Sequence, residues 1–206
     1  RKPDHMSKTF VLRVQERLNQ YGAGLKADGL AGPATNAALD TYLPAKDVRP
    51  TDTGTIPDDY WPMLAKIESG NRPYVKASTS SASGLYQFIK STWQGEGGKW
   101  GPNMSLAFGG FKPSEAEQLQ RARTFTERNV LALRKAGIPI NNASLYAAHF
   151  LGAGTAIKAL EGTHTDRIDA HVGQAAIQAN PSILGNGKTV GDFLTWLHRK
   201  TGAWAK

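Results

Sequence analysis

The sequence predicts a mainly α-helical protein made of two parts. Apolar residues recur at helical spacing in several segments, and few segments show the alternation typical of strands. A stretch rich in Pro, Thr, Asp and Gly, residues 44–59, separates a short N-terminal part from a long C-terminal part. With 40% hydrophobic residues and a mean hydropathy of −0.42, the chain can form a globular core and is too apolar for a disordered protein.

Two short helices are expected in the N-terminal part. The first has an apolar stripe at helical spacing, made of Val11, Val14, Leu18 and Tyr21. Gly22 is expected to end it, and Asp28-Gly29 is a turn signal. Pro33 can start the second helix, because the first turn tolerates a missing N–H, and Tyr42 would then face the first helix.

The long C-terminal part is expected to be helical. Asp58 or Asp59 would cap a first helix that ends at Gly70. Ser114 and Glu117 have the spacing of a capping box and predict another helix. Further helices are expected at about 143–160, 166–179 and 189–200. The last of these mixes aromatic and basic residues, so it either closes the core or touches an anionic membrane weakly.

Composition excludes several classes of site. There is no cysteine, which rules out disulfides, thiolate metal sites and a cysteine nucleophile. The 25 Lys and Arg against 17 Asp and Glu give a net charge of +8, which indicates either a polyanionic partner or only a well-solvated surface. The cations are scattered, so no nucleic acid is expected. The five His show no metal-ligand spacing, so neither metal nor cofactor is expected.

A single carboxylate, Glu68, precedes a Ser-rich loop without Asp or Glu before Gln87. A carboxylic acid facing an apolar cleft has its pKa raised by desolvation, as a general acid for glycosidic cleavage requires. A second carboxylate could come from elsewhere, from Glu96, Glu161 or Asp192. Alternatively, an N-acetyl group of the substrate supplies the nucleophile, and one acid suffices. The residues alone also allow Glu68 to be a solvated surface glutamate.

The segment ESGNRPYVKASTSSASGLYQFIKSTW, residues 68–93, resembles the signature of soluble-type lytic transglycosylases, which share the goose-type lysozyme fold. The matching positions are Glu68-Ser69, Ser78, Gly84-Leu85, Gln87 and Thr92. The resemblance implies a lysozyme-like helical catalytic domain over residues 58–206, with Glu68 as its only acid/base.

The same resemblance implies substrate contacts from the loop that follows Glu68. Ser78 would hydrogen-bond the N-acetyl or nearby glycan groups, and Gln87 would contact the sugar at the cleavage site. Ile89 would line the cleft, and Tyr86 is expected to bind substrate with them. Gly84 would make a tight turn or a close backbone approach.

A second block, AAHFLGAG at residues 147–154, stands where the family has A-Y-N-x-G. His149 replaces the family's Tyr and Phe150 its Asn, which resembles a phage-type branch. His149 or the nearby Tyr146 would then take over the substrate contact. His149 could instead be a core histidine bonded to backbone. The closing segment ANPSILGNGKTVGDFLTWLHRK is also similar to that of phage transglycosylase domains.

The N-terminal part, VQERLNQYG…ADGLAGPATNAAL, is similar to the peptidoglycan-binding module with a V-Q-x-x-L…D-G-x-x-G-x-x-T pattern. The matching residues, expected to serve wall binding, are Gln15, Asp28, Gly29, Gly32 and Thr35. The module would span residues 7–45, shorter than usual, with a linker over 46–57. It could instead be a small structural prefix of the catalytic domain. Residues 1–6, RKPDHM, are expected to be a vector-derived remnant, with Met6 the native start.

The resemblance together with the composition leads to an expected function. The chain would be a monomeric phage endolysin that cleaves the β-1,4 bond between N-acetylmuramic acid and N-acetylglucosamine of bacterial peptidoglycan. RKPDHM lacks the apolar run of a secretory signal, so the protein would stay in the host cytoplasm until a holin releases it to the periplasm. Two alternatives remain: a hydrolysing muramidase and a non-catalytic wall-binding virion protein.

Overall fold

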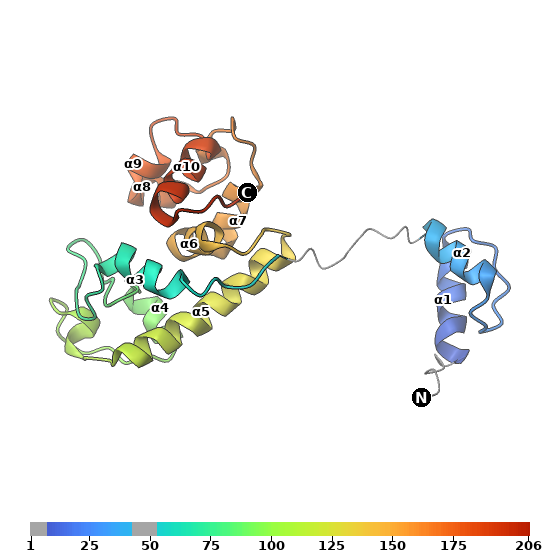
Figure 1. Ribbon diagram of the computed structural model, residues 1–206, viewed down its shortest axis with the longest axis horizontal. Helices are drawn as coiled ribbons and strands as arrows, with labels where there is room; N and C mark the ends of the chain where they lie inside the picture. Colours follow the sequence, from blue (N-terminus) through green and yellow to red (C-terminus); the bar gives the residue numbers. More distant parts are fainter. Residues whose placement is uncertain (1–7, 43–52) are drawn as a thin grey trace. The chain divides into compact units, whose positions relative to one another are not determined.

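The protein is mainly α-helical. The computed structural model describes residues 8–42 and 53–206. Within these two ranges the backbone forms ten α-helices and two short 3₁₀-helices, and its β-structure is limited to isolated bridges (Figure 1). None of these helices combines the length and the hydropathy that crossing a bilayer requires.

The chain divides into two compact units, residues 1–51 and 52–206, and the division falls within the segment expected to be a linker. The expected vector-derived remnant and positions 46–52 of the expected linker lie outside the described residues.

The last part of the expected linker belongs to the second unit. The Thr53 carbonyl accepts a hydrogen bond from the Ile140 amide, and the Gly54 carbonyl accepts one from Arg134 Nη2 at 2.9 Å. Ile56 packs against the hydrophobic core. The linker prediction of 46–57 therefore extends too far, because three of its last five residues are held by contacts distant in sequence.

The first unit contains α1 (Lys8–Gln20) and α2 (Pro33–Tyr42). Pro33 begins α2 as predicted, since its missing N–H falls in the first turn. Val11 and Leu18 of the predicted stripe are buried, but Tyr21 is 61% exposed and lies past the end of α1. The Tyr42 hydroxyl donates a hydrogen bond to the Gly22 carbonyl at 3.0 Å, just after the end of α1.

One buried side chain organises this unit. Gln15 is 2% exposed, and its Nε2 donates to Asp28 Oδ1, the Leu30 carbonyl and Thr35 Oγ1 at 2.9–3.1 Å. Its Oε1 accepts from the backbone amides of Asp28 and Gly29 at 3.1 and 2.8 Å. Gly29 has φ +73, and a Cβ there would lie 2.7 Å from the Lys8 carbonyl oxygen. The Asp-Gly turn is thus tied to α1 by the amide of Gln15.

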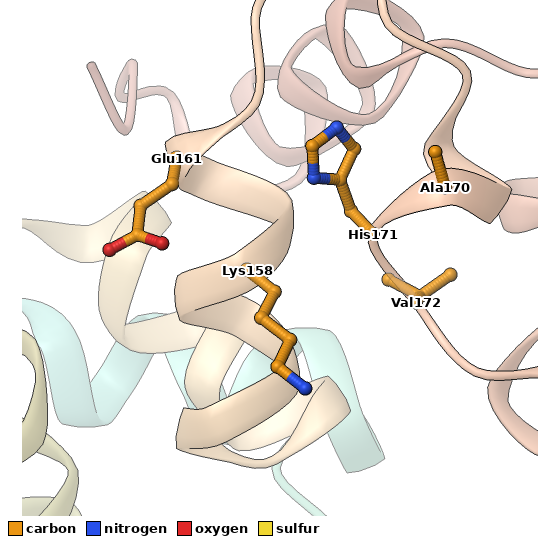
Figure 2. A pocket seen from close by; sticks show the side chains of 5 residues that line it. All are labelled: Lys158, Glu161, Ala170, His171 and Val172. Atoms are coloured by element: carbon orange, nitrogen blue, oxygen red, sulfur yellow. The ribbon is translucent and has the colours of Figure 1, made fainter.

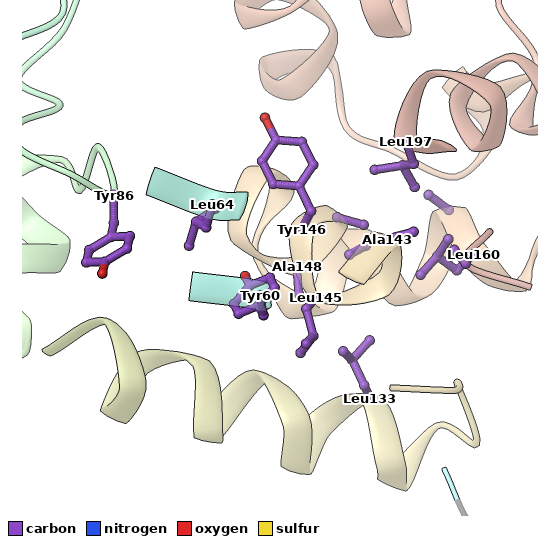
Figure 3. Close-up of a cluster of buried hydrophobic side chains, with 14 of the residues drawn as sticks. Tyr60, Leu64, Tyr86, Leu133, Ala143, Leu145, Tyr146, Ala148, Leu160 and Leu197 are labelled. Atoms are coloured by element: carbon purple, nitrogen blue, oxygen red, sulfur yellow. The ribbon is translucent and has the colours of Figure 1, made fainter. Parts of the chain in front are cut away.

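The second unit is built around a buried central helix. Its helices are α3 (Tyr60–Ser69), α4 (Lys90–Gly95), η1 (Ala107–Gly110), α5 (Glu115–Lys135), α6 (Asn142–Leu151), α7 (Ala153–Glu161), η2 (Ile168–Ala170), α8 (Gln174–Ala179), α9 (Pro181–Leu184) and α10 (Val190–Thr201). Residues 142–148 of α6 are all buried, and α6 packs against α5, α7 and α10. Figure 3 shows Leu145 and Leu133 on one side of α6, while Tyr146 points its hydroxyl the other way.

Two of the predicted helices are interrupted. The helix predicted at 143–160 is α6 followed by α7, broken at Gly152, whose φ of 78° and ψ of 148° are not helical. The segment predicted as a helix at 166–179 forms only η2 and α8. Its start is held extended, since Arg167 bridges to Thr189 and the Ile168 amide donates to the Lys188 carbonyl at 2.9 Å.

Helix ends follow the sequence in part. Gly70 ends α3 with a left-handed φ of 60°, as predicted. Ser114 Oγ accepts from the Glu117 amide at 3.1 Å, but the Glu117 carboxylate binds Arg121 instead of completing the capping box. Of the two expected capping residues, Asp59 stands at the N-cap position of α3, but its carboxylate makes no capping bond and accepts from Asn142 Nδ2 at 3.1 Å.

The predicted helix at 189–200 is α10, and its apolar side faces the core. Phe193, Leu194 and Leu197 are fully buried. Thr189 and Asp192 form the capping box at its start. This burial favours the alternative in which the helix closes the core over the one in which its apolar face meets a membrane.

The loop between α3 and α4, residues 70–89, is held by buried polar side chains. Gln118 of α5 accepts from the Leu85 amide at 2.8 Å and donates to the Pro73 carbonyl at 3.0 Å. Ser83 Oγ accepts from the Phe108 amide at 3.1 Å. Gly84 has φ +78, and a Cβ there would lie 2.3 Å from Gln118 Oε1 and 2.4 Å from the Phe108 ring. Both readings of Gly84, tight turn and close approach, are confirmed.

Replacing Gly84 with Ala is expected to destabilise the second unit by about 2–4 kcal/mol, because strain at positive φ adds to overlap with Gln118 and Phe108. All five tryptophans lie in residues 52–206, so urea unfolding followed by tryptophan fluorescence reports this unit. Gly154→Ala is the matched control: its Cβ would meet nothing within 4 Å, and it is expected to be neutral or slightly stabilising. Equal unfolding midpoints for the two variants would contradict the role of Gly84.

Candidate active site

A cleft of about 760 Å³ lies in the second unit. Its polar lining consists of Glu68, Thr79, Ser80, Gln87, Thr92 and Asn180, and its largest other side chains are Phe88, Ile89, Phe125, His149 and Phe150. These residues come from the end of α3, the loop before α4, the middle of α5, the end of α6 and the end of α8. Thr92 comes from α4 itself, so the cleft is assembled from six separate segments around one carboxylate.

Glu68 is presented by the C-terminal turn of α3. The helix ends two residues later at Gly70, and the adjacent Ser69 is buried. Ser69 Oγ donates to the Ala65 carbonyl at 2.9 Å and accepts from the Arg72 amide at 3.2 Å, while Arg72 Nε donates to the Ser69 carbonyl at 2.8 Å. These bonds fix the chain where it leaves α3. The Glu-Ser pair thus combines a cleft carboxylate with a hydroxyl that holds its backbone.

Among the described residues that line the cleft, Glu68 is the only carboxylate. The three other acids considered as partners lie elsewhere. The carboxylate of Glu96 is 4% exposed and paired with Arg128. Asp192 accepts from the Thr189 amide at the start of α10. Glu161 projects from α7 beside a different pocket (Figure 2). The arrangement therefore offers no second carboxylate for a two-acid mechanism.

Two buried tyrosines lie in the electrostatic field of Glu68. Burial raises the pKa of the Tyr146 phenol, and the charge of Glu68 and a hydrogen bond to its carboxylate raise it further. Burial also raises the pKa of Tyr60, again reinforced by Glu68. Both phenols therefore stay protonated near neutral pH. Tyr146 is buried behind Glu68 and does not itself line the cleft.

His149 lines the cleft inside a ring of aromatic side chains. Its imidazole lies 5.4 Å from the Phe88 ring and 6.2 Å from Phe125, and it stacks on Tyr146 at 6.4 Å. Burial lowers the pKa of His149, and the charge of Glu68 and a bond to the Tyr86 backbone offset this only in part. The imidazole is therefore neutral near pH 7.

The Nδ1 of His149 is buried without a hydrogen-bond partner in the described parts of the chain. Leaving such an atom unpaired costs about 1–3 kcal/mol, and exceptions of this kind often mark a functional site. The bond to the Tyr86 backbone fits the alternative of a core histidine. Its position in the cleft lining fits the substrate contact, so His149 combines features of both.

Gln87 and Ile89 also line the cleft. Gln87 has a left-handed φ of 51°, which is uncommon for a residue with a side chain. Its Nε2 donates to the Gly84 carbonyl at 2.9 Å and the Val75 carbonyl at 3.3 Å, which fixes the side chain at the cleft wall. Ile89 is 45% exposed and precedes the first residue of α4.

Besides Tyr146, two further expected substrate-binding residues do not line the cleft. Ser78 is exposed on the loop, next to Thr79 and Ser80, which do line it. Tyr86 is 6% exposed and packs edge-on against Trp61, with ring centroids 6.3 Å apart. Their expected roles in substrate binding remain predictions.

Sequence reasoning missed several lining residues. Phe88 follows Gln87 directly but belongs to no matched position, and Phe125 lies in the middle of α5, far from any matched position. Asn180 comes from the end of α8, far from the other residues in sequence. Asn180 belongs to the closing segment ANPSILGNGKTVGDFLTWLHRK, but only the tertiary fold brings it to the cleft.

The residues expected to bind the wall are mostly internal to the first unit. Gln15 and Thr35 are buried, and Asp28 bonds to Gln15 and to the Leu30 amide. Gly29 is buried at the turn and Gly32 is partly exposed. The polar side chains of this motif are thus engaged with one another.

No protein-family model matches the chain. The case for a function therefore rests on the cleft itself. One carboxylate, hydroxyl and amide groups, and aromatic walls can exchange a proton with a bound ligand, hydrogen-bond its polar groups and pack on its apolar faces. Within residues 8–42 and 53–206 there is no cluster of three side chains of the kind that hold a metal ion.

The lowered pKa of His149 predicts a pH-dependent stability. The unfolded chain has an ordinary His pKa near 6.5, so below that pH the unfolded state binds the additional proton and stability falls as pH falls. The loss cannot exceed about 1.4 kcal/mol per pH unit for one proton. Urea unfolding at pH 7.5 and 5.0 should show a smaller difference for His149→Phe than for wild type. His164→Gln, at an exposed position, is the control and should keep the wild-type difference.

Proposed function

We propose that the protein is a peptidoglycan lytic transglycosylase with a lysozyme-like catalytic unit, residues 58–206, in which Glu68 is the single acid/base. The observation that carries the proposal is the cleft in which, within residues 53–206, Glu68 is the only lining carboxylate. Its hydroxyl and amide groups suit a glycan with N-acetyl substituents, and its aromatic walls suit the apolar faces of sugar rings.

Cleavage would begin with proton transfer from the Glu68 carboxyl to the oxygen of the β-1,4 bond between N-acetylmuramic acid and N-acetylglucosamine. As that bond breaks, the acetamido oxygen of the muramic sugar attacks its own C1 and forms an oxazolinium ring. The N-acetylglucosamine end leaves as an alcohol. This step needs no second carboxylate, which agrees with the composition of the cleft.

The second step would use Glu68 as a base. Its carboxylate takes the proton of the C6 hydroxyl, the C6 oxygen attacks C1, and the acetamido group is restored. The product carries a 1,6-anhydro ring, and Glu68 is again protonated. This outcome requires water to be kept from C1, for which the rings of Phe88, Phe125 and Phe150 around the cleft are suited.

The products of digestion test this proposal. Purified Gram-negative sacculi should release muropeptides that are one water lighter than reducing ends, as measured by mass spectrometry. Glu68→Gln should lower the rate of cleavage by at least about 10³-fold, because the amide can neither donate the proton in the first step nor accept one in the second. Glu127→Gln, at an exposed position of α5, is the control and should keep wild-type activity.

Reducing muramic ends would instead assign the protein as a hydrolysing muramidase. Release of nothing by the folded wild-type protein would support the non-catalytic wall-binding alternative. Near wild-type activity of Glu68→Gln would remove the single-acid mechanism.

The biological role that we propose is that of a phage endolysin. The protein would accumulate in the host cytoplasm and lyse the cell after a holin gives it access to the periplasm. The first unit would hold the enzyme on peptidoglycan. The similarity of its V-Q-x-x-L…D-G-x-x-G-x-x-T residues to a wall-binding module supports this division of tasks.

Deleting residues 1–45 should weaken binding to sacculi by roughly tenfold, because a second tethered contact raises the effective concentration. Cleavage of soluble glycan fragments should be unchanged, since the cleft lies wholly in the second unit. Co-sedimentation with sacculi, in the Glu68→Gln background to prevent digestion, measures the first effect. Unchanged sedimentation would mean that the first unit has no binding role.

A further inference from the structure

A second cavity, of about 380 Å³, lies between α4 and the start of α5. The residues that define it chemically are Trp93, Lys99, Phe111, Lys112, Glu117 and Arg121. None of them belongs to the cleft around Glu68, and none has a part in the cleavage steps above.

The floor of this cavity is a fixed polar assembly. Arg121 Nε and Nη2 donate to Glu117 Oε1 at 2.9 and 2.8 Å, and Arg121 Nη1 donates to the Glu96 carbonyl. The guanidinium lies 5.3 Å from the centre of the Trp93 ring. Trp93 Nε1 donates to the Lys99 carbonyl at 3.0 Å. The floor is thus ordered before any ligand arrives, and the charge of Arg121 is balanced by Glu117.

The mouth of the cavity carries the excess positive charge. Lys99 and Lys112 are both exposed, and within residues 53–206 neither forms an ion pair with a carboxylate. Phe111 is 48% exposed, and Lys112 Nζ lies 6.0 Å from the ring of Tyr74, which is 44% exposed. Two unpaired ammonium groups beside two exposed rings suit a ligand with carboxylates on a partly apolar chain.

The cavity is close to the cleft along two helices. Arg121 of the cavity and Phe125 of the cleft are four residues apart on α5, a rise of about 6 Å. On α4, Thr92 lines the cleft and Trp93 lines the cavity. Along α5 the two sites are thus separated by about the length of two extended residues, each of which spans about 3.3–3.6 Å.

We propose that this cavity binds the acidic stem peptide that the muramic sugars of peptidoglycan carry. Lys99 and Lys112 would receive the peptide carboxylates, and Phe111 would cover its aliphatic part. The inference rests on the proposed function for its choice of ligand. It adds a specificity site: glycan that keeps its stem peptides would be held at two places, and glycan without them at one.

The sugar-free tetrapeptide of Gram-negative peptidoglycan tests the site without any glycosidic bond. Calorimetric or NMR titration of the full-length Glu68→Gln protein at low salt should detect binding, with shifted Trp93 and Phe111 resonances. Lys99→Ala/Lys112→Ala should weaken the affinity at least tenfold. The control is the double variant Lys135→Ala/Lys158→Ala, which removes the same charge at exposed positions elsewhere in the unit. It should change the affinity for the tetrapeptide less than twofold. A tetrapeptide with amidated carboxylates should bind the parent protein at least tenfold more weakly.

The outcomes separate this site from the catalytic proposal. Tetrapeptide binding that depends on Lys99 and Lys112 supports the site even if sacculi are not cleaved. Cleaved sacculi without tetrapeptide binding, or equal weakening by both double variants, overturns it. Binding of phosphatidylglycerol vesicles that depends on these lysines, with no tetrapeptide binding, overturns it in favour of a membrane contact.

Discussion

The burial of α6 is the interaction on which the second unit and its cleft depend. Ala143, Leu145, Ala147 and Ala148 are fully buried, and these mostly small side chains let α5, α7 and α10 approach the helix. A close-packed interior transmits its geometry rigidly, so the rings that α6 carries have little freedom. Tyr146 and His149 lie on this helix, next to the end of α3 where Glu68 is presented. The position of the carboxylate is thus set by the same packing that forms the core.

The same burial decides which groups can carry charge. Burial raises the pKa of Tyr60 and Tyr146 and lowers the pKa of His149, so all three side chains stay neutral near pH 7. In the proposed mechanism, the acid/base chemistry is therefore left to one carboxylate. This supports a mechanism in which the substrate supplies its own nucleophile, because neither a second carboxylate nor an imidazolium is at hand.

Local signals predicted the helices and several of their ends. Gly70, Ser114 and the 189–200 segment behave as the sequence indicates, because caps and glycine turns depend on residues a few positions apart. Predictions failed where distant residues compete. The Asp59 carboxylate binds Asn142 instead of capping its helix. Sequence motifs had pointed to four of the cleft residues, Glu68, Gln87, Ile89 and His149. Asn180 could not be found this way, because only tertiary packing brings it to the cleft.

The two motifs of the chain differ in what their residues do. In the second unit the motif has two roles. Ser69 and Gly84 help to fix the backbone, and Glu68 places a carboxylate in the cleft. In the first unit the side-chain amide of Gln15 bonds the Asp28-Gly29 turn. The motif there stabilises the fold of the unit and leaves this amide engaged within it. In the proposed wall binding, sugar contacts would therefore come from exposed side chains beside the motif. Tyr21 is the largest of these aromatic surfaces, at 61% exposure, and it lies next to the Gly22 carbonyl that holds Tyr42.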